Sequence, residues 1–179
     1  MINISDSLAL FVDMQERMMP AINNHEEVIR RACILARGAR LLGLPVLAAR
    51  QYPKGLGETV APLLEALGEH DVTDKTAFSC LGDEILRNKI AAAGRKNVLV
   101  AGVESHICVL QTVLDLLEGG YNVYLAADCC GSRKESDRGY AEWRMALAGA
   151  KMTTVESVLF ELMTHKDHPA RKDIQALIK

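Results

Sequence analysis

The sequence lacks an excess of either charge, a long hydrophobic run and a regular cysteine pattern. Lys and Arg number 21 against 23 Asp and Glu, which gives a formal net charge of −2, and no basic stretch stands out. We therefore expect neither nucleic acid nor an anionic membrane as a main partner. The apolar runs are shorter than the roughly 20 residues that a membrane-spanning helix needs.

The cysteines are few, odd in number and irregularly spaced: Cys33, Cys80, Cys108, Cys129 and Cys130. Nothing ahead of Ile4 resembles a secretory signal. Together these features predict free thiols in a reducing, intracellular (cytoplasmic) protein. Cofactor motifs are also missing, because Gly55-Leu-Gly57 lacks the third glycine of a dinucleotide loop and no phosphate-binding Walker loop is present. We expect no cofactor.

What the chain does have is ordinary globular composition arranged as an alternation of β-rich and helical segments. Its 179 residues are enough for one domain with a substantial core, so we expect a single domain over residues 1–179. Apolar and helical periodicities predict strands at 8–13, 44–49, 70–72, 97–102, 122–127 and 152–155, and helices at 26–42, 59–67, 82–93, 107–118, 136–148, 158–163 and 173–178.

Strands with consecutive apolar residues, joined by helices, are typical of crossover connections in a parallel sheet. We therefore predict a Rossmann-like, three-layer α/β/α sandwich. In such a sheet ligands bind at the carboxyl ends of the strands, near the point where strand order reverses. Strands one and four are neighbours at that point.

Three residues of complementary chemistry fall on this edge. Asp13 ends the first predicted strand, Cys108 lies in the turn after the fourth strand, and Lys75 follows the short third one. A helix N-terminus and a nearby ammonium would favour the thiolate of Cys108. Asp13 could take the thiol proton and return it to a leaving amine, while Lys75 keeps the carboxylate ionised.

Each of these residues also has an ordinary structural explanation. An aspartate at a strand end can be a turn former, a cysteine at a helix start can be a small buried apolar residue, and a lysine beside Asp74 can be a solvated loop residue. Singly, the structural explanation is favoured. Their joint position on one sheet edge favours a catalytic site.

At these positions the sequence resembles the isochorismatase-like hydrolases, and especially the subgroup of isochorismatase domain-containing proteins. The matching segments are Phe11-Val-Asp-Met-Gln-Glu-Arg17, Gln51-Tyr-Pro-Lys-Gly-Leu-Gly57, Lys75-Thr-Ala-Phe-Ser79, Gly102-Val-Glu-Ser-His-Ile-Cys-Val-Leu-Gln-Thr112, Ser132-Arg133, and the tail from Lys166-Asp-His-Pro169 to Ile174-Gln-Ala-Leu-Ile178. The resemblance runs from end to end, and several segments in one order are more specific than any single motif.

The resemblance implies a six-stranded, mostly parallel sheet, a homo-oligomer and an Asp–Lys–Cys triad at Asp13, Lys75 and Cys108. It also implies a cis peptide bond between Val103 and Glu104, with the backbone N–H groups of Glu104 and Cys108 as the oxyanion hole. The activity it implies is hydrolysis of an amide-type C–N bond of a small molecule through a thioester.

The sequence departs from the nicotinamidases of this superfamily, which carry an Asp-x-His-x-x-x-His metal motif after the second strand. The corresponding region here, Arg50-Gln-Tyr-Pro-Lys54, has no histidine, so we expect no metal. Gln51, Tyr52 and His106 are candidate pocket residues. His106 is two residues from Cys108 and should not face it on a helix.

Other signals have two readings. His165 and His168 could bind a metal, but the Pro169 turn favours a surface cap, and Trp143 is expected in core or interface packing. Cys129-Cys130 could be a redox switch or two buried thiols. Two functional alternatives to amide hydrolysis stay open: vinyl-ether cleavage of isochorismate with the aspartate as acid, and a redox-sensing or binding protein without turnover.

Overall fold

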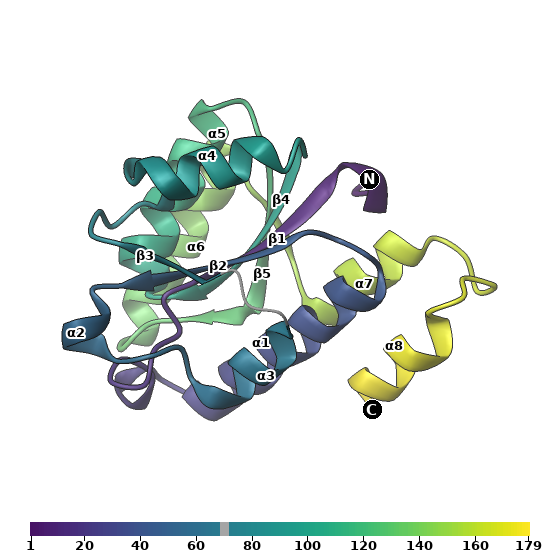
Figure 1. Ribbon diagram of the computed structural model, residues 1–179, viewed down its shortest axis with the longest axis horizontal. Coiled ribbons are helices and arrows are strands. Elements are labelled where there is room, and N and C mark those ends of the chain that lie inside the picture. The colour runs from purple at the N-terminus through teal and green to yellow at the C-terminus, as the bar shows by residue number, and fades with distance from the viewer. Residues whose placement is uncertain (69–71) are drawn as a thin grey trace.

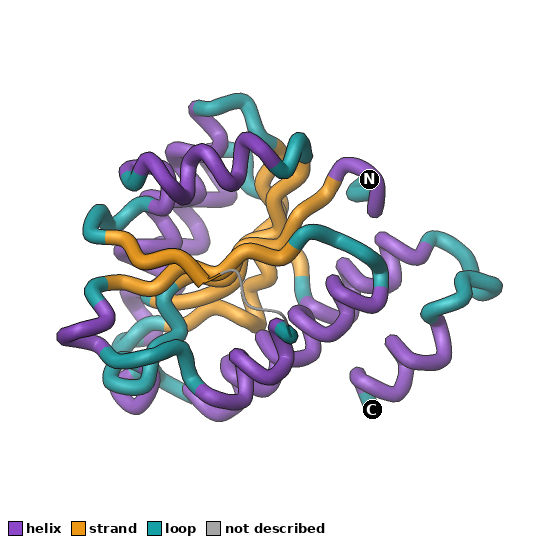
Figure 2. The backbone as a smooth tube through the Cα atoms, in the orientation of Figure 1, coloured by secondary structure: helices purple, strands orange, loops and turns teal. Residues whose placement is uncertain are grey.

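The computed structural model describes residues 1–68 and 72–179. A single parallel sheet of six strands runs through its centre, in the order β3-β2-β1-β4-β5-β6 (Figure 2). The strands are β1 (Ser7–Val12), β2 (Val46–Gln51), β3 (Val72–Lys75), β4 (Asn97–Val103), β5 (Asn122–Gly131) and β6 (Lys151–Thr153). This confirms the predicted fold, with β1 and β4 adjacent where the strand order reverses.

Helices cover both faces of the sheet (Figure 1). One layer holds α1 (His25–Leu41), α3 (Ala61–Leu67), α7 (Val155–Met163) and α8 (Arg171–Ile178), and the other holds α4 (Glu84–Ala92), α5 (Leu110–Glu118) and α6 (Glu135–Ala148). A further helix, α2 (Pro53–Leu56), follows β2. Among the described residues, no helix is long and apolar enough to cross a bilayer.

The central strand β1 shows how the sequence builds two cores. Successive side chains of a strand point to opposite faces. Ala9 and Phe11 therefore enter the core under α1, whereas Leu8, Leu10 and Val12 enter the core under α4, α5 and α6. Every residue of β1 is buried, which explains why its sequence reads as a continuous apolar run.

Four of the differences between the observed and the predicted element boundaries have a clear local basis. The third strand pairs with β2 from Val72 to Lys75, whereas the predicted 70–72 falls partly on residues outside the described part of the chain. β5 continues to Gly131 because it pairs with the end of β4. The last strand stops at Thr153, since the Thr154 side chain caps α7. The predicted helix 107–118 begins as a separate π-type turn, Ser105–Val109, followed by α5.

Gly102 allows β1 and β4 to approach closely beside the predicted site. It pairs with Val12 and has φ +135°, a conformation that side chains rarely adopt. A Cβ there would lie 2.1 Å from the Val12 carbonyl oxygen, one residue before Asp13.

We expect Gly102→Ala to lower the free energy of unfolding by more than about 2 kcal/mol, because the backbone must move to accept the methyl group. Urea unfolding measures this, with Gly139→Ala as a control, since a Cβ there meets nothing within 4 Å.

Candidate active site

Asp13, Lys75 and Cys108 converge at the carboxyl edge of the sheet, beside the reversal point between β1 and β4. Asp13 comes directly after β1 in the left-handed backbone region, with φ 52°. Lys75 ends β3, two strands away, and its Nζ lies 2.7 Å from Asp13 Oδ2. The Cys108 thiol, in the turn after β4, lies close enough to the Asp13 carboxylate for each group to shift the pKa of the other. The structure therefore brings all three together, as the topology predicts.

The Lys75 ammonium is enclosed by more oxygens than it has protons. Besides Asp13, Nζ donates to Gln51 Oε1 at 2.7 Å, to the Phe78 carbonyl at 2.9 Å and to the Ala77 carbonyl at 3.1 Å. An ammonium has three N–H donors, and the side chain is fully buried. These three acceptors and the nearby Asp13 carboxylate fix its position. Lys75 is therefore suited to hold a positive charge in one place beside Asp13.

Asp13 is fully buried and is held mainly by charge. Neither carboxylate oxygen has a well-aligned hydrogen bond from an N–H or O–H among the described residues, although Lys75 Nζ lies close to Oδ2. Burial raises the pKa of Asp13, and the charge and proximity of Lys75 followed by the Cys108 thiol partly offset that rise. A carboxylate in this setting can accept a proton and later return it.

The surroundings of Cys108 contradict the expectation that its thiolate form is favoured. Burial first, and then the negative charge of Asp13, raise the pKa of the Cys108 thiol to about 12, and Lys75 only partly opposes them. Cys108 also lies inside the helical turn Ser105–Val109, rather than at the first residue of that turn or of α5. Cys108 is therefore a thiol at neutral pH and needs a base.

This protonation state predicts slow alkylation of the free protein. The rate constant for iodoacetamide at Cys108 should rise about tenfold per pH unit, without a plateau below about pH 10, because the thiolate fraction is the reacting form. Peptide mass spectrometry at each pH measures it, with N-acetylcysteine as the reference thiol. A plateau near neutral pH would contradict the assignment.

The turn that carries Cys108 begins at a cis peptide bond between Val103 and Glu104. The Glu104 carbonyl accepts the N–H groups of Ile107 and Val109, and Ser105 Oγ donates to the Gly131 carbonyl. The buried Glu104 carboxylate accepts both the backbone N–H and Nε of Arg133 through Oε2, at 3.0 and 3.1 Å. The ends of β4 and β5 thus fix the turn on two sides.

A glutamine that the sequence analysis did not single out organises the opposite side of the site. The buried Gln15 donates from Nε2 to the carbonyls of Gln51 and Gly57, and its Oε1 accepts the Gln51 N–H. Gln51, predicted as a pocket residue, uses its own side chain on Lys75 and on the Thr76 carbonyl. It therefore positions the lysine. The only sequence signal for this role of Gln15 is its position two residues after Asp13.

Of the other predicted pocket residues, His106 is half-buried and Tyr52 is exposed. His106 Nδ1 is 3.0 Å from Ser132 Oγ, and Nε2 is 4.0 Å from Asp137 on α6, so its ring bridges the turn to α6. Tyr52 is 57% exposed. Trp143 is 60% exposed on α6 and lines, together with Tyr140, a hollow of about 420 Å³. Of the two predicted roles of Trp143, core packing is therefore wrong.

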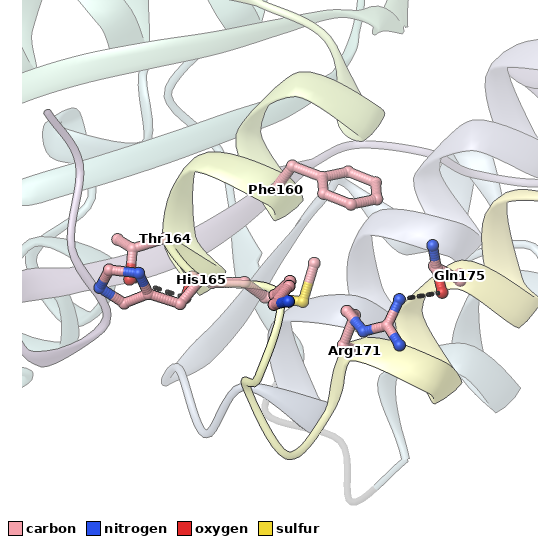
Figure 3. Close-up of a pocket in the computed structure, with 7 residues that line it drawn as sticks. Phe160, Thr164, His165, Arg171 and Gln175 are labelled. Carbon is pink, nitrogen blue, oxygen red and sulfur yellow. Dashed lines mark hydrogen bonds between the residues drawn. The ribbon is translucent and has the colours of Figure 1, made fainter.

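Two further sequence signals lie away from the triad. His165 lines a hollow of about 300 Å³ between α7 and α8, and Figure 3 shows its ring turned away from Arg171 and Gln175. His168 Nδ1 accepts the Ala170 N–H. No group of three or more metal-ligating side chains occurs among the described residues. Cys129 and Cys130 are fully buried in β5, and burial raises the pKa of both thiols.

Comparison with known proteins agrees with this architecture. Residues 7–157 match the isochorismatase domain family. Isochorismatase domain-containing protein 1 of Danio rerio is 42% identical over 179 residues, covering 99% of this chain and 63% of the relative. The chain thus spans less than two thirds of that relative's length.

Two solved structures share nearly the whole fold. The structure of MAR1 ribonuclease from Caenorhabditis elegans has a TM-score of 0.94 and 39% identity, covering 99% of this chain and 91% of that one. YcaC from Pseudomonas aeruginosa, solved with covalent acrylamide, has a TM-score of 0.89 and 27% identity, covering 98% and 87%. The fold and these matches define the class, the isochorismatase-like hydrolases. Within that class, the chain belongs to the isochorismatase family.

Proposed function

We propose that this chain is a cysteine hydrolase that cleaves an amide-type C–N bond of a small molecule through a thioester on Cys108. The observation that carries the proposal is the buried trio, in which a thiol faces a carboxylate that lies 2.7 Å from an enclosed ammonium. Burying such a charge pair carries a desolvation cost in folding free energy, so its presence favours a functional role. Its position at the carboxyl edge of the sheet is where α/β folds bind ligands.

The proposed first half-reaction forms a bond between sulfur and the acyl carbon. Asp13 takes the proton from Cys108 Sγ as the sulfur attacks the carbonyl carbon. Lys75 offsets the negative charge that moves between sulfur and carboxylate. The tetrahedral intermediate collapses when Asp13 gives the proton to the amine nitrogen, so the C–N bond breaks and a thioester remains.

The second half-reaction restores the enzyme. Asp13 takes a proton from water, whose oxygen attacks the thioester carbon, and the C–S bond breaks as Asp13 returns the proton to sulfur. The products are a carboxylic acid and an amine. In both halves the oxyanion would accept hydrogen bonds from the backbone N–H groups of Glu104 and Cys108, which belong to the turn after β4.

The acrylamide adduct of YcaC supports a nucleophile in this fold, because acrylamide is an electrophile to which thiols add. Vinyl-ether cleavage leaves Cys108 without a role, and a redox sensor would not need the buried Asp13–Lys75 pair. The ribonuclease relative raises RNA as a substrate. The net charge of −2 and the buried triad favour a small amide over a polyanion.

The test is mass spectrometry of the intact protein with a panel of small amides and ureido acids, with hydroxylamine as a thioester trap. An acyl adduct on Cys108 that hydroxylamine releases is the expected result. RNA cleavage that requires Cys108, or oxidation by peroxide with no acyl adduct across the panel, would replace the proposal.

We also propose that the protein forms a homo-oligomer, because α6 exposes the large apolar side chains Tyr140, Trp143 and Leu147. We further propose a reducing, cytoplasmic location, because the cysteines are free.

A further inference from the structure

A cavity of about 300 Å³ opens at the same sheet edge as the triad. Its lining comes from the segments that follow four strands: Arg17 and Met18 after β1, Leu56 after β2, Glu104 after β4 and Arg133 after β5. Glu104 belongs to the cavity wall and also accepts the N–H groups of Ile107 and Val109 in the Cys108 turn. The cavity wall and the reactive turn thus share a residue.

Arg133 presents a guanidinium with free donors to this cavity. Its Nε and its backbone N–H are both used on Glu104 Oε2. No described residue accepts a hydrogen bond from its terminal nitrogens, and its side chain is 59% exposed while that of Glu104 is 7% exposed. A buried carboxylate therefore holds Nε of the guanidinium and leaves the terminal N–H donors available to a ligand.

Arg17 adds a second positive charge to the lining of the cavity. Its Nη1 donates to the Gly55 carbonyl at 2.8 Å, and it forms no ion pair within the described chain. Glu104 is the only carboxylate among the lining residues, so two guanidinium groups face one negative charge. Met18 and Leu56 supply apolar surface in the same lining. A small ligand with a short apolar body and an anionic end fits this lining.

We propose that the cavity binds the carboxylate of the substrate through Arg133 and Arg17, so that the substrate of Cys108 is a small amide or ureido compound bearing a carboxylate. Glu104 acts as a positioning residue, because its carboxylate orients Arg133 and its backbone lies in the Cys108 turn. The inference rests on the proposed function for its substrate. The binding of an anionic group by this cavity, called here the anion receptor, can be tested without a known substrate.

The probe is a pair of alkylating reagents of similar size, iodoacetate and iodoacetamide, which differ in charge. Both are reacted with the intact protein at one alkaline pH, and peptide mass spectrometry gives the two rate constants at Cys108. In Arg133→Gln the ratio of iodoacetate to iodoacetamide constants should fall about tenfold, the size expected for one charge-assisted hydrogen bond. Arg17→Gln should lower the ratio less, and Arg133→Lys should recover part of it.

Arg144→Gln is the matched control, because Arg144 is exposed on α6 and does not line the cavity. Thermal unfolding of each variant verifies its fold. A ratio unchanged in both Arg133→Gln and Arg17→Gln, or lowered equally in Arg144→Gln, would overturn the receptor. If the charge preference holds while no amide acylates Cys108, the hydrolase proposal fails and the anion receptor stands. If amides acylate without regard to charge, the receptor fails alone.

Discussion

Cys108→Ala should abolish acyl adducts and lower the turnover of an identified amide substrate by at least about 10⁴-fold, while the protein stays folded. Loss of a covalent nucleophile removes the whole two-step route, and in enzymes that use one the cost reaches roughly 10⁶ in turnover. Cys108 is a small, nearly buried residue, so its truncation to alanine removes one sulfur from the core under α5. The measurements are turnover, adduct mass and the free energy of unfolding.

Cys33→Ala provides the matched control. Cys33 is also a buried thiol, but it lies on α1, in the core on the opposite face of the sheet. It should retain both acylation and turnover. Comparable loss in the two variants would point to general destabilisation, and full turnover by a folded Cys108→Ala protein would exclude the thioester route.

Lys75→Met should cost about 3–5 kcal/mol of folding free energy near neutral pH and remove activity, because it leaves the Asp13 carboxylate buried without a counter-charge. The pKa of Asp13 is already raised by burial, and Lys75 is the main group opposing the rise. Removing it should raise that pKa further. Guanidinium unfolding and the rate of Cys108 acylation report the two effects.

The loss of stability should depend on pH in a defined direction. A carboxyl group whose pKa is raised in the folded state binds its proton more tightly there than in the unfolded chain, so its ionised form destabilises the protein. The deficit of Lys75→Met should therefore shrink as the pH falls and Asp13 becomes neutral. Asp13→Asn/Lys75→Met should regain stability at high pH without regaining activity. A deficit independent of pH would show that lost packing, rather than the unpaired charge, is responsible.

The sheet and its reactive edge could be predicted because they depend on local patterns. Leu8–Val12 and Val98–Val103 are continuous apolar runs, and the parallel topology that such runs imply places Asp13 beside Cys108. The boundaries failed where a single side chain decides them, as at Thr154, whose hydroxyl ends the last strand by capping α7.

The electrostatics of the site could not be read from sequence. Proximity of Lys75 suggested a thiolate, but the pKa of Cys108 depends on how much water the fold removes, and burial outweighs the ammonium. The role of Gln15 was invisible for a related reason. Its three hydrogen bonds reach backbone groups of residues 51 and 57, which only the folded chain brings within reach. Gln51 likewise proved to hold Lys75.

The position of β1 in the middle of the sheet has a consequence for biosynthesis. This strand leaves the ribosome ahead of its partner β4, which spans residues 97–103, so their pairing must wait until the whole segment between them has been synthesised. Until then one edge of a strand that is apolar from Leu8 to Val12 stays unpaired, a condition that favours aggregation and chaperone capture. The carboxylate and the thiol meet only after that long loop closes, so a nascent or truncated chain would carry both residues without the reactive centre.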